Sequence, residues 1–230
     1  MRAGAVSVVI PSLNEAAQIE ATLASLGLGP ADEAVLVDGQ SSDGTAARAQ
    51  ALQLQGLTVL ETPPGRGAQL RAGVAASQAP WLLFLHADSR LEPGALDALR
   101  HSSREWGYLR LRFTRRTLGL RVLEGGIRLR ACLRGPTGDQ AIFVRRELLE
   151  RVGGVPEVPF LEDLVLARRL GAEARPRALP AEVRTSARRY EERGLVATTL
   201  RMWSIRAAFA LGVSPSRLAR SYPSVREGAG

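Results

Sequence analysis

Short apolar blocks alternate with amphipathic segments along the first hundred residues. The blocks are rich in valine and leucine and end in polar residues, which predicts strands at 6–10, 34–37, 57–60 and 81–85. The segments between them place apolar residues at helical spacing and predict helices at 14–26, 42–54 and 66–77. Strands and helices that alternate in this way predict an α/β fold, with a mostly parallel sheet flanked by helices on both faces.

The pattern is looser after residue 100. The periodicity predicts strands at 108–114 and 140–144, amphipathic or apolar helices at 118–133, 161–170 and 194–211, and a loose tail after Ser214. A length of 230 residues suits one domain. We expect that domain at 1–175, in two halves (1–100 and 101–175), with a C-terminal helical extension at 176–230 packed on it.

Charge is distributed unevenly between the two halves of the chain. Residues 1–100 carry 6 arginines and 10 acidic residues, whereas residues 101–230 carry 25 arginines and 13 acidic residues, and the chain has no lysine. The cationic second half predicts an anionic partner, such as phosphate groups or an acidic membrane surface. The small number of aromatic residues and the lack of a recognisable module argue against nucleic acid.

Two predicted helices concentrate this charge beside apolar residues. Arg121 and Arg128 lie in the first, and Arg201, Trp203 and Arg206 lie in the second. Helices of this kind can lie on an anionic membrane surface. Two alternatives stay open: the helices pack on the core with solvated arginines, or their apolar faces form a homodimer.

The chain start and the hydropathy pattern predict a cytoplasmic protein. Residues 1–5 lack the apolar core of a signal peptide, and the longest apolar run, 79–85, is far shorter than the about 20 residues that cross a bilayer. Peripheral contact at the inner face of the cell membrane remains compatible with this. The single cysteine, Cys132, excludes an internal disulfide and suits an inert, semi-buried thiol.

Polar segments follow three of the predicted strands, at 11–15, 38–44 and 86–88. In open parallel sheets, ligands bind beyond the carboxyl ends of the strands, so we expect the reactive groups at one edge. Asp88 there could hold Mg²⁺ or Mn²⁺ together with phosphate oxygens, or it could simply cap a turn. His86, two residues earlier, fits a hydrogen-bonded residue at the rim better than a metal ligand.

Five other polar residues fit nucleotide or acid–base chemistry. Asp38 and Asp43 could accept hydrogen bonds from a ribose or a base, although Asp43 suits a capping role equally well. Arg66 stands between two glycines and could bind phosphate, or it could belong to an ordinary loop. Glu162 and Asp163 open a predicted helix, where a carboxylate can act as a general base or merely match the helix dipole.

The order of these segments closely resembles that of family 2 glycosyltransferases of the GT-A fold. The resemblance runs from residue 6 to about 170 and rests on VVIPSLNE (8–15), VDGQSSDGT (37–45), GRG (65–67), HAD (86–88), GGVPE (153–157) and ED (162–163). The string GDQAIFVRR (138–146) resembles a small bacterial subgroup with a Gly-Asp-Gln motif.

The resemblance implies a Rossmann-type sheet and an inverting transfer of a sugar from a nucleotide-diphosphate sugar, with a divalent metal. Residues 1–100 would then bind the nucleotide and residues 101–175 the acceptor. A UDP-sugar is the favoured donor and a hexose the expected group. The Q-x-x-R-W motif of processive synthases is absent, which favours single-sugar transfer. The acceptor is unknown, and a lipid-linked one would suit the basic helices.

The same resemblance assigns roles to residues of this sequence. Asp163, with Glu162 beside it, matches the catalytic base, and Asp88 matches the metal-holding acid of the family's D-x-D motif. Asp139 and Gln140 would lie near the acceptor or the diphosphate. The implied nucleotide-binding residues are Pro11, Ser12, Asn14, Glu15, Asp38, Gly39, Ser41, Asp43, Arg66, His86, Ala87 and Asp88.

One departure from the family pattern keeps a second reading open. His86 stands where the family has the first aspartate of D-x-D. The chain could therefore be a non-catalytic module that binds a nucleotide-sugar. A sugar-phosphate nucleotidyltransferase fits less well, because residues 11–15 lack the glycines and the basic side chain expected after the first strand.

Overall fold

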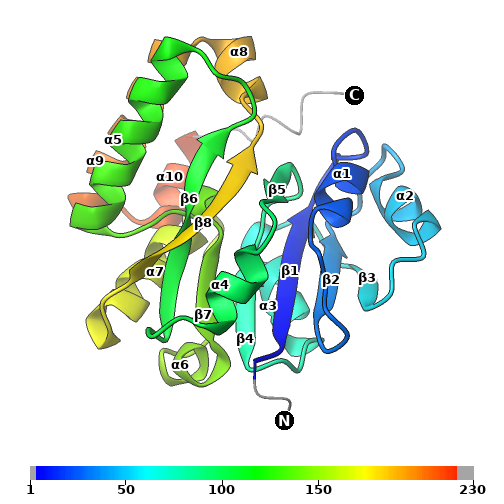
Figure 1. The fold of residues 1–230 in the computed structure, drawn as a ribbon. Coiled ribbons are helices and arrows are strands. Elements are labelled where there is room, and N and C mark those ends of the chain that lie inside the picture. Colours follow the sequence, from blue (N-terminus) through cyan, green and yellow to red (C-terminus); the bar gives the residue numbers. More distant parts are fainter. Residues whose placement is uncertain (1–3, 222–230) are drawn as a thin grey trace.

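The computed structural model describes residues 4–221, with the side chains of all of these except Arg189 and Ser221. An eight-stranded sheet runs through the molecule (Figure 1). Its strands are β1 (Val6–Ser12), β2 (Glu33–Asp38), β3 (Leu57–Glu61), β4 (Trp81–Phe84), β5 (Ser89–Leu91), β6 (Trp106–Phe113), β7 (Ile142–Arg145) and β8 (Arg177–Thr185). The order across the sheet is β3-β2-β1-β4-β7-β6-β8-β5.

The first four strands form a parallel unit, as the sequence pattern predicts. β1 pairs in parallel with β2 and β4, and β2 pairs in parallel with β3. β7 is antiparallel to both β4 and β6, β6 is parallel to β8, and β5 is antiparallel to β8. The chain leaves β1 toward β3 on one side and continues with β4 on the other, so the crevice between the ends of β1 and β4 is a topological switch point.

Helices connect the strands and cover the sheet. They are α1 (Ile19–Ala24), α2 (Thr45–Ala51), α3 (Arg66–Ala75), α4 (Ala95–Arg100), α5 (Leu118–Arg134), the 3₁₀ turn η1 (Gly138–Gln140), α6 (Arg146–Arg151), α7 (Glu162–Glu173), α8 (Arg188–Arg193), α9 (Leu195–Ala210) and α10 (Pro215–Ser221). Of the helices in residues 4–221, none is long and apolar enough to cross a bilayer.

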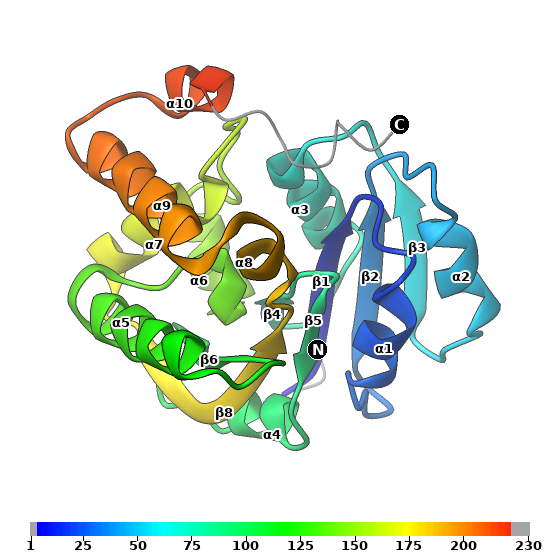
Figure 2. The ribbon, with the colours of Figure 1, turned by 90° about the horizontal axis from the view of Figure 1, so that it is seen from above.

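Alternate residues of the strands serve two apolar layers. Val8 and Ile10 of β1 pack with residues of α1, α2 and α4, whereas Val9 packs with residues of α3, α6 and α7. The helices α3 and α7 accordingly lie on one side of the sheet and α4 on the other (Figure 2). A side chain at Gly73 would place its Cβ 2.3 Å from Val9 Cγ1, so the glycine allows α3 to pack closely on β1.

Several predictions about the second half of the chain were wrong. Residues 177–185 form β8 inside the sheet, so the segment at 176–230 is not a purely helical extension. The proline at 180 obscures this strand in the sequence, and a bulge in its pairing with β6 accommodates it, since Tyr108 pairs with Ala178 but Arg110 pairs with Glu182. Residues 215–221 of the predicted loose tail form α10, because Leu218 packs against Ile205; residues 222–230 lie outside the described residues.

Two smaller expectations also need correction. Cys132 is exposed rather than semi-buried, because it lies on the outer surface of α5. The helices α1 and α2 are shorter than predicted, since the residues before them form loops. The cap of α2 is Gly44 at φ 83°, and the preceding Ser41 and Ser42 form hydrogen bonds with Asn14 in the loop after β1.

Candidate functional site

The carboxyl ends of β1, β2 and β4 meet at one edge of the sheet, where the sequence places the polar segments. Asp38 at the end of β2 is 2% exposed and accepts three hydrogen bonds. The donors are the Ser12 hydroxyl (3.0 Å), the Ser41 amide (2.7 Å) and the Ser41 hydroxyl (2.6 Å). The carboxylate therefore fastens the loop after β2 to the end of β1.

The loops after β1 and β2 are joined by a further set of hydrogen bonds. The backbone amide of Asn14 donates to the Ser41 hydroxyl at 2.8 Å, and the side-chain oxygen of Asn14 accepts from the backbone amide of Ser42 at 2.9 Å. Asp43 accepts from the Ala16 amide at 2.9 Å and from the amide and hydroxyl of Thr45. Asp43 thus fastens the first loop to the start of α2, whose cap is Gly44.

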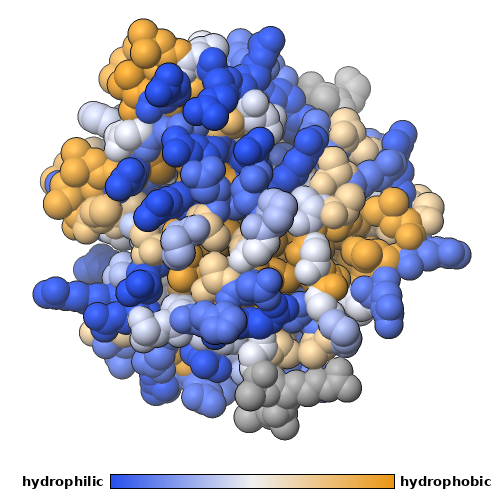
Figure 3. Space-filling view, viewed as in Figure 1, coloured by the Kyte–Doolittle hydropathy of each residue, from blue (hydrophilic) through white to orange (hydrophobic). Residues whose placement is uncertain are grey.

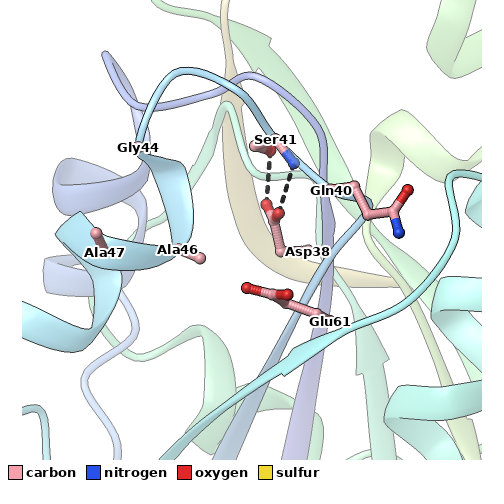
Figure 4. Close-up of a pocket in the computed structure, with 7 residues that line it drawn as sticks. All are labelled: Asp38, Gln40, Ser41, Gly44, Ala46, Ala47 and Glu61. Carbon is pink, nitrogen blue, oxygen red and sulfur yellow. Dashed lines mark hydrogen bonds between the residues drawn. The ribbon is translucent and has the colours of Figure 1, made fainter.

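A shallow cavity of about 370 Å³ lies beside Asp38, between α2 and the ends of β2 and β3 (Figure 4). Its lining consists of Asp38, Gln40, Ser41, Gly44, Ala46, Ala47 and Glu61. Glu61 ends β3 and pairs with Asp38 across the strands. Sequence reasoning missed Glu61, although the rule that selected Asp38, a carboxylate at a strand's carboxyl end, selects it too. A cavity with hydroxyl, amide and carboxylate groups suits a nucleoside.

Gln69 of α3 links the ends of β1 and β2. Its amide nitrogen donates to the carbonyl oxygens of Ser12 at 2.7 Å and Val37 at 2.9 Å, and the side chain is buried. Gly39, whose amide donates to Ser12 at 2.9 Å, leaves room for this contact, because an added Cβ would lie 2.9 Å from the Gln69 nitrogen. Pro11 lies within β1 opposite Val37.

A second group of polar residues surrounds Arg66 at the start of α3. Its Nε lies 2.9 Å from Oε1 of Glu162, and its Nη2 lies 2.6 Å from Nε2 of His86. Since a guanidinium only donates, His86 accepts this hydrogen bond at Nε2. Burial works to lower the pKa of Arg66, but the charges of Glu162, then Asp163, Asp139 and Asp88, raise it above its ordinary value. One cation thus stands among four carboxylates.

The two acids that open α7 point in different directions. Glu162 is 5% exposed, and burial raises the pKa of its carboxyl, with Asp163 adding to the rise and Arg66 opposing it. Asp163 is half-buried; its Oδ2 accepts from the Gly138 amide at 2.7 Å and its Oδ1 from the Leu164 amide at 2.8 Å. Glu162 therefore holds Arg66, while Asp163 faces the turn η1.

The turn η1 brings Asp139 and Gln140 next to this group. The Thr137 hydroxyl donates to Asp139, and the buried Gln140 side chain accepts from Arg130 at 3.0 Å. Arg130 of α5 also donates to the Thr137 hydroxyl and the Gly135 carbonyl oxygen. Burial lowers the pKa of Arg130, and Arg206 adds to this. Arg130, which sequence reasoning did not select, therefore anchors the turn to α5.

Asp88 follows the chain out of β4. Its Oδ1 accepts from the Ser89 hydroxyl at 3.3 Å, and the preceding Ala87 carbonyl oxygen accepts from Thr22 at 2.8 Å. In the part of the chain that the structure describes, no three His, Cys, Asp or Glu side chains gather as a metal site. Mg²⁺ is usually held by one or two carboxylates plus substrate phosphates, so a single half-exposed carboxylate beside Arg66 fits a metal that arrives with a diphosphate.

Glu15 links the site to the C-terminal part of the chain. Its carboxylate is 1% exposed and lies 3.3 and 3.4 Å from Nη2 of Arg188, which is in α8. The predicted site residues thus form two neighbouring groups, one around Asp38 and one around Arg66, with α3 contributing Gln69 to the first and Arg66 to the second. His101 is exposed on the far end of α4 and takes no part.

Part of the chain is similar to a known family of enzymes. Residues 7–102 match the model of glycosyl transferase family 2. The match covers less than half of the chain, and it includes the Asp38 group, Arg66 and Asp88 but not η1 or α7. An uncharacterised glycosyltransferase of Mycobacterium tuberculosis is 37% identical over 99 residues, which is 43% of this chain and 44% of that relative. A relative from Mycobacterium bovis gives the same figures.

Solved structures show the same fold over most of the chain. Staphylococcus aureus TarS (residues 1–349) has a TM-score of 0.62 at 16% identity, over 79% of this chain and 60% of that one. A mannosyltransferase of Pyrobaculum calidifontis, solved with GDP-Man and Mn²⁺, has a TM-score of 0.58 at 19% identity, over 94% of this chain and 78% of that one. Glucosyl-3-phosphoglycerate synthase of M. tuberculosis, solved with Mn²⁺, UDP and glucosyl-3-phosphoglycerate, has a TM-score of 0.52 at 25% identity, over 79% of this chain and 70% of that one. The fold is therefore α/β of the GT-A type.

Proposed function

We propose that this chain is a glycosyltransferase of family 2 that moves one hexose from a nucleotide-diphosphate sugar to an acceptor hydroxyl with inversion. The observation that carries the proposal is the group around Arg66. A guanidinium that can neutralise a diphosphate lies among Asp88, Asp139 and Asp163, at the edge where the two halves meet. The family match over residues 7–102 and the nucleotide complexes of two similar structures support a nucleotide-sugar donor.

The proposed mechanism assigns each group a separate task. The cavity beside Asp38 holds the nucleoside, and Arg66 stabilises the negative charge that develops on the departing diphosphate. Asp163 takes the proton of the acceptor hydroxyl while the oxygen of that hydroxyl forms a bond to the anomeric carbon. The bond from the anomeric carbon to the diphosphate oxygen breaks on the opposite side. Asp88 would hold a Mg²⁺ or Mn²⁺ ion, which when bound supplies further positive charge to the diphosphate.

Asp163 suits the base better than Glu162. Glu162 is buried and faces the guanidinium of Arg66, so its carboxylate is not free to meet an acceptor. Asp163 is half-buried next to η1, where residues of the acceptor half lie. A UDP-sugar is the donor that we favour, by the resemblance of the VVIPSLNE and VDGQSSDGT strings to the family.

Thermal stabilisation by UDP, GDP and dTDP, each with and without Mn²⁺, tests donor binding. A bound nucleotide stabilises by RT ln(1 + [L]/Kd), about 2.7 kcal/mol at a hundredfold excess over Kd. We expect a metal-dependent shift for UDP that Asp88→Asn abolishes. The matched control is Asp97→Asn, an exposed carboxylate on α4 away from the site. If no nucleotide shifts the melting temperature, the donor site is refuted.

A second candidate, a module that binds the donor without transferring it, is favoured by one observation. His86 replaces the first acid of the D-x-D motif and is held by Arg66. Release of UDP from UDP-sugars, with and without acceptors, separates the two functions. We expect turnover that Asp163→Asn lowers by at least about a hundredfold, with nucleotide binding unchanged. Nucleotide binding without any release of UDP would establish the module instead.

A further inference from the structure

The large apolar side chains exposed on this protein are gathered at one end of it. Among the described residues, the one outlier is Leu52 at the end of α2, with 40% of its surface exposed. The others are between 61% and 86% exposed and belong to α5, to α9 or to the residue after α9. They are Leu118, Val122, Leu129, Leu133, Val196, Leu200, Trp203 and Leu211, here called the docking face.

The spacing places the residues of the docking face on one side of each helix. In α5 the intervals are four, seven and four residues; in α9 and the residue after it they are four, three and eight. Such intervals follow the helical repeat. The opposite sides are buried, through Leu120 and Ile127 in α5 and through Thr198 and Ile205 in α9. Each helix therefore has one apolar side for the core and a second that nothing in the described chain covers.

The two helices touch at their first turns. A Cβ added at Gly119 of α5 would lie 2.6 Å from Leu195 of α9. Both helices lie at the same end of the molecule in Figures 1 and 2. Figure 3 shows apolar surface along the edge where Figure 1 places α5 and α9, interspersed with hydrophilic residues. Monomeric soluble proteins seldom expose so many large apolar residues in one region.

The positive charge around the docking face favours a negatively charged binding partner. Residues 115–134 and 194–221 contain ten arginines and one acidic residue, Glu124. Glu124 faces inward, where it accepts from Arg112 and from the Phe113 amide. A second copy related by a two-fold axis would oppose this basic surface to itself, at an electrostatic cost. A negatively charged surface complements it instead.

We propose that the docking face binds the surface of a membrane that contains anionic lipids. The apolar side chains would enter the boundary between headgroups and acyl chains, with Trp203 at the depth that this residue prefers, while exposed arginines such as Arg121 and Arg128 contact headgroups. This inference does not rest on the proposed transfer reaction. It places the acceptor half next to the bilayer, since Arg130 of α5 holds η1 and Ile205 of α9 packs on the start of α7.

Flotation of the full chain with vesicles tests the proposal. We expect recovery with phosphatidylcholine vesicles that contain phosphatidylglycerol, and at least about tenfold less with phosphatidylcholine alone. Leu129→Ser combined with Trp203→Ser should weaken binding by at least about tenfold, and Arg121→Gln or Arg128→Gln by about fivefold each. Leu52→Ser, the matched exposed apolar residue, should bind as the wild type does. A vesicle-induced blue shift of fluorescence would report Trp203, because Trp81 and Trp106 are already buried.

Three results would overturn the proposal. The first is no recovery of the wild type with the anionic vesicles at about 0.1 M salt, where charge attraction still acts. The second is equal loss of binding in Leu52→Ser. The third is a dimer in light scattering that Trp203→Ser dissociates, in a protein that does not float with vesicles, which would make a second copy of the chain the occupant. All variants change exposed side chains, and their melting temperatures check that the fold is retained.

Discussion

Asp43 stabilises two loops of the candidate site through one carboxylate. It accepts hydrogen bonds from the Ala16 amide in the first loop and from the amide and hydroxyl of Thr45 at the start of α2. Slight burial works to raise its pKa, but these hydrogen bonds outweigh burial and hold the pKa below its ordinary value of 3.8. The folded protein therefore binds fewer protons at this group than the unfolded chain does.

We expect Asp43→Ala to lower the free energy of unfolding by about 1 kcal/mol at neutral pH, because the backbone amides of Ala16 and Thr45 lose their charged hydrogen-bond acceptor. The contribution of Asp43 is complete above pH 3.8 and is lost as the pH falls through the lower pKa of the folded state. Urea unfolding of both proteins between pH 7 and pH 3 measures this. Ser42→Ala in the same loop is the control without a carboxyl group. A difference that stays constant down to full protonation would contradict the assigned role.

The sequence could point to candidate site residues that stand at the end of a strand or the start of a helix, but not to residues whose place depends on distant partners. Asp38, Arg66 and Asp163 follow from strand ends, glycines and a helix start. Gln69 could not be identified, because its partners are two carbonyl oxygens 57 and 32 residues earlier in the chain. Arg130 was likewise one arginine among many until η1 was seen to depend on it.

Two glycines in the middle of α5 lower the stability of this helix. Gly125 and Gly126 lie in its middle, and a Cβ added at either would meet no atom within 4 Å. Glycine in a helix interior is less favourable than alanine by roughly 1 kcal/mol, because the unfolded chain has more freedom to lose. The helix is therefore weaker than its length of 17 residues suggests.

Gly125→Ala should raise the free energy of unfolding by about 0.5–1 kcal/mol, because the helix accepts the methyl group without a clash. Gly107→Ala is the matched contrast. There the added Cβ would lie 2.0 Å from the carbonyl oxygen of Arg177 in β8, and we expect a loss of more than about 2 kcal/mol. Chemical denaturation of both variants against the wild type gives the two signs. A destabilised Gly125→Ala would show that the outer side of α5 is covered in solution.

Elements were predicted well where one signal dominated and poorly where two competed. The strands β1 to β4 consist mainly of apolar residues, and each was predicted within one or two residues of its bounds. In β8 the buried Leu179 and Val183 are separated by Pro180, Ala181 and Glu182, so the strand pattern was lost. The helix α10 was missed because only Leu218 is buried in it.

At the scale of the whole molecule, the sheet joins the two ends of the chain. β8 lies between β6 and β5, and β5 has no other partner in the described sheet. Leu179 and Val183 belong to the same core as β1 and α1. The fold therefore extends past the boundary at residue 175 that the sequence suggested.

A chain that ends at residue 175 should fail to fold, because it lacks an interior strand of the sheet. We expect it to show no cooperative unfolding transition by circular dichroism and to aggregate. A chain that ends at Ser221 retains every described element and should unfold like the full chain, which makes it the control. Cooperative unfolding of the shorter chain near the wild-type midpoint would restore the original boundary.

The position of β8 also affects how the protein is made. A ribosome releases β1 to β4 early, and these strands can pair as soon as they emerge. β5 is made directly after them, yet its partner is translated almost ninety residues later. Until then β5 has no partner strand, and the carboxylate of Glu15 lacks its contact with Arg188. The candidate site of the nascent protein thus stays incomplete for most of its synthesis.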